Sequence, residues 1–581
     1  MLTLSLTMIA KKIHLSTLLI IFIFFLGFFL RFNQLSNIPN GLYPDETAIG
    51  YNAYSILMTG KDEHGISLPM YFQSFDDYKL PVYIYATALA IKEFGANAFA
   101  VRFTSALFGS LTIIAIYFLV YELSKKKTLA ALTSFFLAIN PWHTFFSRVG
   151  YEVNLATALL VIGMLCFVSA INRKNNFFLF LFSIVAFLLS LYTYSVTRII
   201  SPLIFIALIF LYYKQITVNS KKLLLTLFSL FFVGVLPFII TFIPLQSLPG
   251  FASQKDALII GTAEKSEILQ TRSYFVFLPQ IIQKIFFNYW ILVVWKFLGN
   301  IIAFFSTGFF FITGANHPYE NIAGFGMFYY FDLPLMLFGA YQGLKKKISY
   351  LYPFYLWFLF MLFIGSVIVA IPNDAFGTRT YAVVIPLIVF SAYGMYSLVE
   401  LIMRLKNKFI KTGIVASLII LIGYSCLFYF TSYFFRFPIE YAKEWRSEDQ
   451  KTVQYVSSIA KNYKTIVFDD STGFTYTSLL FYGLYPPQIH QQQAIYKPSG
   501  LVIGLAKDGK YEFRKIDWGK ELTNKGTLFI TGASNVPANR SPIAVFSYPT
   551  RPVVIYYDRK IAQYPTTETA YKIFESGNTV K

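Results

Sequence analysis

The feature that most constrains this chain is a succession of apolar runs, each long enough to cross a bilayer, separated by small basic clusters. The first run covers residues 13–30 and follows Lys11 and Lys12. A membrane span needs about 20 such residues. Only 13% of the 581 residues are charged, against roughly 25% in soluble domains. The sequence therefore predicts a polytopic, α-helical integral membrane protein.

The basic clusters predict the orientation of the spans, because lysine and arginine accumulate on the cytoplasmic side. Eleven spans are expected, or thirteen if the apolar stretch 286–313 crosses twice. Either number leaves the N-terminus in the cytoplasm and the C-terminus outside, in a plasma-membrane protein. The spans are expected at residues 13–30, 98–122, 128–146, 153–171, 177–194, 199–213, 223–245, 327–344, 350–371, 380–402 and 412–432.

Several functional classes are excluded by composition and motifs. The net charge of +20 suggests nucleic acid as a partner, but the basic residues lie between apolar runs and are explained by topology. Cys166 and Cys426 both fall inside apolar runs, so no disulfide framework and no CxxC metal site is expected. The nucleotide-binding, metalloprotease and hydrolase motifs GxGxxG, HExxH and GxSxG are absent.

The chain divides into two predicted domains. Residues 1–432 form the transmembrane domain, with a first outer loop, 31–97, that carries helices lying in the membrane interface. After residue 432 the composition becomes that of a soluble protein. An amphipathic helix is predicted at 447–461. Short strands are predicted at 465–468, 527–530, 543–546 and 553–556, so residues 433–581 are expected to form an extracytoplasmic α/β domain.

Asp45 and Glu46 lie in the first outer loop, directly after Pro44, at the edge of the bilayer. Ionisable groups beside hydrocarbon are costly and usually mark functional sites. A structural alternative is that Asp45 caps the helix predicted at 47–58, with Glu46 in its favourable first turn. On a helix the two neighbouring side chains would diverge, which disfavours the paired carboxylates of a glycosidase.

Further polar residues are predicted at the outer ends of spans or in outer loops. The strongest signal is Lys79, which precedes an aromatic, apolar segment and suits a lipid phosphate at headgroup depth. The structural alternative is a side chain that extends toward the interface without binding anything. The other members of this set are Asp76, Asp77, Tyr83, His143, Arg148, Glu152, Arg198, His317, Asp374 and Arg379.

The order of these elements resembles the GT-C superfamily of membrane glycosyltransferases. The residues that carry the resemblance are Pro44-Asp45-Glu46 in the first outer loop, the Lys-x-Pro-x-Tyr element from Lys79 to Tyr83, and Asn97 to Arg102 at the start of the next span. The chain is most similar to the family 39 branch, which includes protein O-mannosyltransferases and the lipid A aminoarabinose transferase. Where that branch often has Glu-Lys-Pro-Pro, this chain has Tyr-Lys-Leu-Pro, so Asp76 or Asp77 is the expected acidic partner of Lys79.

The resemblance implies transfer of a sugar, with inversion, from a polyprenyl-phosphate carrier to a protein, lipid or glycan acceptor at the outer face. It implies catalytic roles for Asp45 and Glu46, and donor-phosphate binding by Lys79 with Arg148 or Arg379 and with Asp77. Glu152, one helical turn from Arg148, is expected to orient it. Arg198, His143 and Tyr83 are acceptor-side or orienting candidates. No cofactor is indicated, and a requirement for a divalent metal is left open. A glycan polymerase or ligase using the same carrier, or a lipid or sugar transporter, remains an alternative.

Overall fold

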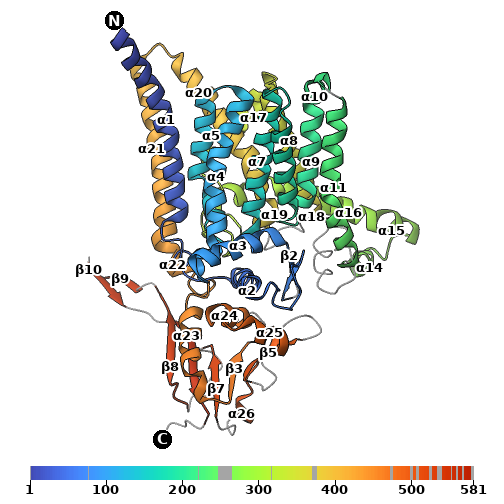
Figure 1. Ribbon diagram of the computed structural model, residues 1–581, viewed down its shortest axis with the longest axis vertical. Coiled ribbons are helices and arrows are strands. Elements are labelled where there is room, and N and C mark those ends of the chain that lie inside the picture. The colour runs from blue at the N-terminus through green and yellow to red at the C-terminus, as the bar shows by residue number, and fades with distance from the viewer. Residues whose placement is uncertain are drawn as a thin grey trace. The chain divides into compact units, whose positions relative to one another are not determined.

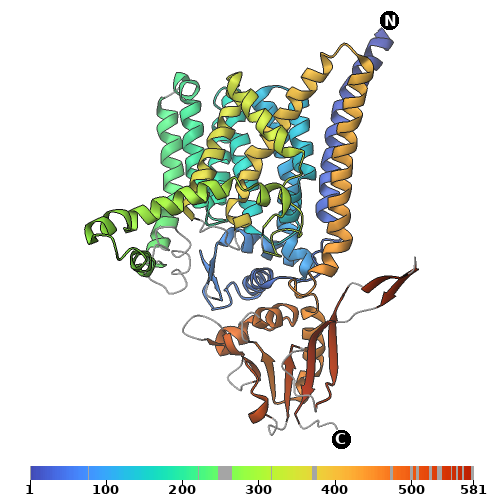
Figure 2. The ribbon, with the colours of Figure 1, turned by 180° about the vertical axis from the view of Figure 1, so that it is seen from behind.

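The computed structural model describes most of the chain, which forms two compact units (Figures 1 and 2). The first unit contains residues 1–33, 105–147 and 151–429, and the second contains 34–104, 148–150 and 430–581. Residues described are 2–75, 77–219, 221–245, 265–315, 317–368, 376–470, 475–496, 502–505, 510–521, 526–532, 540–550, 553–557, 560–564 and 568–576. Asp76 and Asp374 lie outside these ranges, and of Asp77 only the backbone is described.

The first unit is a helical bundle. Its elements are α1 (Leu2–Phe32), α4 (Ala98–Ser124), α5 (Lys127–Ile139), α6 (Pro141–Ser147), α7 (Glu152–Asn172), α8 (Phe177–Leu191), α9 (Thr197–Leu211), α10 (Tyr213–Asn219), α11 (Lys221–Leu245), α14 (Lys265–Ser273), α15 (Gln280–Phe286), α16 (Tyr289–Phe304), η1 (Gly308–Ile312), α17 (Asp332–Lys345), η2 (Ser349–Leu351), α18 (Tyr352–Ile368), α19 (Phe376–Thr380), η3 (Tyr381–Val383), α20 (Val384–Met403) and α21 (Lys408–Thr431).

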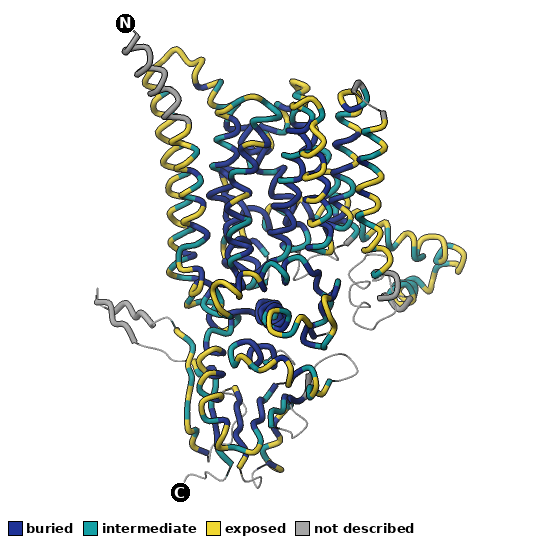
Figure 3. The backbone as a smooth tube through the Cα atoms, in the orientation of Figure 1, coloured by how far each residue is buried: buried dark blue, intermediate teal, exposed yellow. Residues whose placement is uncertain are grey.

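Within the described residues, seven helices are long and apolar enough to cross a membrane, and four more apolar helices are shorter. In the apolar part of α7, 78% of the residues are buried, against 6% in the apolar part of the helical stretch 408–440, which includes α21. Figure 3 shows this contrast between the bundle centre and α21. An apolar helix that exposes its surface in this way is suited to lipid, because a helix that is hydrophobic all round needs an apolar environment. The predicted polytopic helical membrane fold is confirmed.

Three predicted spans differ in detail. The helix predicted at 128–146 is divided at Asn140 into α5 and α6, because Pro141 lacks the N–H that would continue the backbone ladder. The helix predicted at 327–344 begins only at Asp332, with Pro334 in its first turn. In the stretch 286–313, α16 runs crosswise to the neighbouring long helices in Figure 2, although the stretch 280–312 that contains it is long and apolar enough for a span.

The second unit combines the first outer loop with the C-terminal part of the chain. Its elements are α2 (Pro44–Thr59), β1 (Phe72–Ser74), β2 (Asp77–Lys79), α3 (Pro81–Phe94), η4 (Ser432–Arg436), α22 (Phe437–Glu440), α23 (Asp449–Ile459), η5 (Ala460–Asn462), β3 (Thr465–Asp469), α24 (Thr475–Tyr482), α25 (Pro487–Gln493), β4 (Ile495–Tyr496), β5 (Val502–Leu505), β6 (Tyr511–Arg514), α26 (Trp518–Glu521), β7 (Thr527–Thr531), β8 (Ala544–Tyr548), β9 (Val553–Tyr557), β10 (Lys560–Tyr564) and β11 (Glu568–Glu575).

A seven-stranded sheet organises the C-terminal part, in the order β4-β5-β6-β3-β7-β11-β8. Strand β3 is parallel to β6 and β7, and the other pairs are antiparallel. Val467, Phe529 and Phe574 form a buried cluster on the sheet. The predicted C-terminal α/β fold is therefore confirmed. The strand predicted at 553–556 exists as β9, but it pairs with β10 in a separate two-stranded ribbon.

Helix α2 of the first loop packs on α24 of the C-terminal part. The hydroxyls of Thr47 and Thr477 lie 2.8 Å apart, and the Tyr51 hydroxyl donates to the carbonyl of Tyr485 at 3.1 Å. A Cβ atom on Gly50 would lie 2.6 Å from the ring of Phe481, so the close approach of the two helices requires glycine there. The helix that carries the acidic pair is thus fixed to the domain that follows the last long helix.

Candidate active site

Asp45 lies in the first turn of α2, where Pro44 pre-sets the backbone angle of the first helical residue. The N-cap residue is Tyr43, and it makes no side-chain capping hydrogen bond. The structural alternative that Asp45 caps this helix is therefore wrong. A carboxylate in the first turn is still favoured by the helix dipole.

The carboxylate of Asp45 forms an ion pair with Lys79, with 2.9 Å between Oδ1 and Nζ. The Asp45 side chain is 42% exposed and that of Lys79 only 6%, so the acid faces open space and the ammonium lies behind it. The expectation that Asp76 or Asp77 pairs with Lys79 concerns side chains outside the described residues. The partner that the structure shows comes from a helix 34 residues earlier in the chain.

Lys79 is held in place on both sides. It ends strand β2, whose antiparallel register pairs it with Phe72 on β1, and α3 begins two residues later at Pro81. Tyr83 on α3 has no exposed surface, and its hydroxyl donates to the carbonyl of Val101 at 2.9 Å. Tyr83 therefore anchors α3, and in this arrangement it has no surface with which to contact an acceptor.

Glu46 points away from Asp45 into the interior, so the predicted divergence of the two side chains is confirmed. Its carboxylate accepts two hydrogen bonds from Arg102, at 2.8 and 3.0 Å, and one from the backbone N–H of Gly150 at 2.8 Å. Neither Glu46 nor Arg102 has any exposed surface. Both carboxylate oxygens of Glu46 are engaged, so of the two acids only Asp45 has a carboxylate that faces open space.

Arg102 uses all of its N–H groups to organise the loop before α2. Besides Glu46, it donates to the carbonyls of Leu35 at 3.1 Å and Pro39 at 2.7 Å, and to that of Gly41. A guanidinium has five N–H donors, and five bonds are made here. In the sequence, Arg102 is the last residue of the segment 97–102 that resembles the GT-C superfamily, and no role is predicted for it. A buried arginine early in a span is the signal that marks it as important.

Arg148 is also completely buried within this unit. Its Nε donates to the hydroxyl of Tyr433 at 3.0 Å, and a terminal nitrogen donates to the carbonyl of Ile38 at 3.0 Å. The prediction that Glu152 lies one helical turn from Arg148 is wrong, because α6 ends at Ser147 and α7 begins only at Glu152. A non-helical turn containing Gly150 separates the two residues.

The remaining predicted site residues belong to the first unit. The Nδ1 atom of His143 lies 2.6 Å from a guanidinium nitrogen of Arg31, and the Arg198 guanidinium lies 5.0 Å from the centre of the Phe238 ring. Glu152 and Arg379 both interact electrostatically with the hydroxyl of Tyr194.

Glu320, in the loop before α17, was not anticipated from the sequence. It is buried, and its carboxylate accepts the backbone N–H groups of Gly377 at 3.0 Å and Thr378 at 2.8 Å. Burial raises its pKa to about 7, and Arg379 partly offsets this increase. The available signal was an acidic residue three positions after His317 in an outer segment. Among the described residues no group of three or more histidines, cysteines or acids is arranged to hold a metal ion.

Glu63 gives the second unit a testable pH dependence. It is buried, Ser74 donates to its Oε1 at 2.7 Å, and desolvation raises its pKa from 4.5 to about 8. The unfolded chain therefore loses this proton first as the pH rises, so stability falls between about pH 4.5 and pH 8. We expect the melting temperature of Glu63→Gln minus that of the wild type to increase from pH 5 to pH 8, because only the wild type loses stability from the titration of Glu63. The exposed control Glu93→Gln should show no such trend.

Residues 79–240 match the family model described as dolichyl-phosphate-mannose-protein mannosyltransferase. The predicted resemblance to this kind of membrane glycosyltransferase is thereby confirmed over that segment, which begins at Lys79. No curated protein matches the chain significantly.

Solved structures give weaker similarities. The oligosaccharyltransferase of Archaeoglobus fulgidus, tethered to an acceptor peptide with the NVT sequon, has 14% identity and a TM-score of 0.49 over 80% of this chain. This chain spans only 63% of that enzyme's length. ArnT from Cupriavidus metallidurans in the apo state has 10% identity and a TM-score of 0.48, covering 97% of this chain and 98% of that one. Similarity of this degree assigns neither a shared fold nor a function.

Proposed function

We propose, from the match of residues 79–240 to a glycosyltransferase family, that this chain transfers a sugar from a polyprenyl-phosphate carrier to an acceptor hydroxyl. The observation that carries the proposal is the ion pair of Asp45 and Lys79, 2.9 Å apart. Transfer from a lipid phosphate needs a base for the acceptor and a cation for the leaving group. The pair supplies both groups at one place.

Asp45 is proposed as the general base. The acceptor hydroxyl must lose its proton as its oxygen bonds to the anomeric carbon, and a carboxylate within about 3 Å can accept that proton. The bond from the anomeric carbon to the phosphate oxygen breaks in the same step, and Lys79 stabilises the charge that develops on the phosphate. A single displacement of this kind inverts the anomeric configuration.

The ion pair also suggests how donor binding prepares the base. In the structure the carboxylate of Asp45 is already engaged with the Lys79 ammonium. An incoming phosphate competes for that ammonium, because charge-assisted hydrogen bonds to phosphate are strong. Asp45 would then be free to accept the proton of the acceptor hydroxyl.

The other residues of the site have supporting roles in this proposal. Glu46, Arg102 and Arg148 are positioning residues, because their hydrogen bonds hold the loop that leads to Asp45. Roles for Arg379, Glu152, Arg198 and His143 remain predictions. We further propose that residues 433–581 act as an extracytoplasmic domain, with the N-terminus in the cytoplasm. Protease protection of sealed vesicles would test this topology.

The direct test is incubation of the purified full-length chain, in lipid nanodiscs, with polyprenyl-phosphate sugars labelled in the sugar. Stable transfer of one label to an acceptor supports the proposal. Growth of long glycan products would indicate the alternative, a polymerase or ligase that uses the same carrier. Movement of intact donor across sealed vesicles without transfer would overturn the enzyme assignment in favour of a transporter.

Lys79→Ala is expected to weaken use of the carrier about ten- to a hundred-fold, the equivalent of one or two charge-assisted hydrogen bonds. The change should appear in the KM for the donor, while the KM for the acceptor changes less than about twofold. Asp45 is 42% exposed, so it tolerates the loss of its partner without unfolding the chain. The matched control is Lys92→Ala, an exposed lysine on α3. Equal changes in both KM values would remove Lys79 from the phosphate site.

A further inference from the structure

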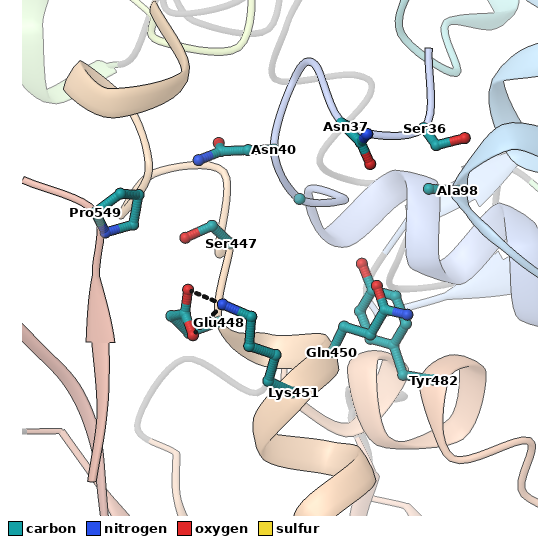
Figure 4. A pocket seen from close by; sticks show the side chains of 11 residues that line it. Ser36, Asn37, Asn40, Ala98, Ser447, Glu448, Gln450, Lys451, Tyr482 and Pro549 are labelled. Atoms are coloured by element: carbon teal, nitrogen blue, oxygen red, sulfur yellow. Dashed lines mark hydrogen bonds and ion pairs between the residues drawn. The ribbon is translucent and has the colours of Figure 1, made fainter. Parts of the chain in front are cut away.

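A polar pocket of about 270 Å³ lies within the second unit, beside the loop that leads to Asp45 (Figure 4). Its walls come from five places in the chain: the loop before α2, the start of α4, the start of α23, the end of α24 and the residue that follows β8. Ligand sites for drug-sized molecules usually have about 300–1,000 Å³, so this pocket has room for a single sugar ring. The lining residues are Ser36, Asn37, Asn40, Gly41, Ala98, Ser447, Glu448, Gln450, Lys451, Tyr482 and Pro549.

The lining side chains suit a ligand with many hydroxyl groups. Two amides, those of Asn37 and Gln450, can each donate and accept hydrogen bonds, as can the hydroxyl of Ser36. Tyr482 adds an aromatic ring with a polar end, which can pack against the C–H face of a sugar. The side-chain oxygens of Asn40 and Ser447 are buried, and the Asn40 amide nitrogen donates to the carbonyl of Pro438 at 2.5 Å. The side chains available to a ligand are therefore the exposed ones of Ser36, Asn37 and Gln450.

The charges of the pocket favour an uncharged ligand. Its acid and its lysine, Glu448 and Lys451, are paired, with Nζ 3.0 and 3.1 Å from the two carboxylate oxygens (Figure 4). The pocket also borders the N-terminus of α23, which by itself would favour an anion. Glu448 at the N-cap and Asp449 in the first turn already place negative charge there. A phosphate group therefore gains little in this pocket.

The pocket is connected to the proposed reaction centre through short links. Gly41 lines the pocket and is four residues from Asp45, so their backbones lie at most about 14 Å apart. The carbonyl of Gly41 accepts a hydrogen bond from Arg102, which also binds Glu46. Tyr482 interacts with the backbone of Leu42 in the same loop. Gly41 and Tyr482 thus connect the pocket to the loop that ends at Asp45.

We propose that this pocket binds an uncharged sugar unit of the acceptor, so that the acceptor is a glycan or glycoconjugate. The identification of the ligand as an acceptor rests on the proposed transferase function, but binding of the sugar does not depend on catalysis. The donor sugar is not the occupant, because it is attached to the phosphate that Lys79 would bind, and Lys79 does not line the pocket.

The test is saturation-transfer NMR on the full-length chain in nanodiscs, with mannobiose, maltose and cellobiose as uncharged probes. At least one disaccharide should bind, and the double variant Asn37→Ala, Gln450→Ala should lower its signal at least fivefold. The matched control is Gln454→Ala, an exposed glutamine one turn further along α23 that does not line the pocket. Both pocket side chains are exposed, so the double variant is expected to fold.

Other outcomes separate this inference from the proposed function. No disaccharide binding, equal binding in the double variant, or specific binding only of inorganic phosphate or of a serine-containing peptide would overturn the pocket assignment. Disaccharide binding that persists in Asp45→Asn, where transfer is lost, supports both proposals. Binding lost in the double variant, with no transfer from any donor by the wild type, would support the pocket while removing the transferase assignment.

Discussion

Asp45→Asn is expected to lower the rate of sugar transfer about a hundred- to ten-thousand-fold while the chain still inserts and folds. The amide has the shape of the carboxylate and its oxygen can still accept a hydrogen bond from Lys79, but it cannot take up the acceptor proton. General-base catalysis contributes a factor of this size. The measurement is the initial rate at saturating donor and acceptor.

Asp517→Asn is the matched control for this prediction. Asp517 forms an ion pair with Lys520 at 3.0 Å in the same unit, and both side chains are exposed. The control variant should retain full activity. A rate for Asp45→Asn within about threefold of the wild type would remove Asp45 from the mechanism, and a melting temperature equal to that of the wild type would show that any loss is chemical.

Arg102→Met is expected to unfold most of the second unit. The substitution leaves the Glu46 carboxylate buried without its ion-pair partner and removes the hydrogen bonds to three loop carbonyls. Removing one partner of a buried ion pair costs about 3–5 kcal/mol. Typical domains have a total stability of only about 5–15 kcal/mol. The yield of folded protein and the fluorescence of Trp445, whose ring lies 5.8 Å from the guanidinium, should both fall.

Glu46→Gln keeps this prediction testable if Arg102→Met does not fold. Glutamine can still accept from Gly150 and Arg102 through its oxygen, so this variant should lose less stability than Arg102→Met. The double variant Glu46→Gln, Arg102→Gln should be more stable than Arg102→Gln alone, because it removes the unpaired buried charge. If Arg102→Met melts within a few degrees of the wild type, the ion pair does not hold the loop.

The parts of this structure that could be predicted from the sequence are those set by local pattern. Apolar runs of sufficient length predict helices such as α7 and α20, and short apolar runs rich in β-branched and aromatic residues predict strands β3 and β7. The helix predicted at 47–58 is found as α2, which begins three residues earlier, at Pro44. Each of these depends on residues within one or two turns of each other, so the signal is present in a single stretch of the chain.

The contacts that build the site depend on residues far apart in the chain, which no local pattern records. Lys79 meets Asp45 across 34 residues, Arg102 meets Glu46 across 56, and Arg148 meets Tyr433 across 285. The sequence therefore indicated that Asp45, Lys79 and Arg148 matter, but it did not indicate their partners. It also assigned the first loop to the membrane domain, whereas the structure places residues 34–104 in one compact unit with the C-terminal part.

The hydrogen bonds of Arg102 have a consequence for how acceptor preference can change. A loop whose carbonyls at residues 35, 39 and 41 are all tied to one guanidinium keeps its path when its outward side chains are replaced. The exposed side chains of Ser36 and Asn37 can therefore be exchanged while the backbone of the loop keeps its path. If the pocket binds the acceptor as proposed, replacing these two side chains changes the glycan preference without rebuilding the backbone.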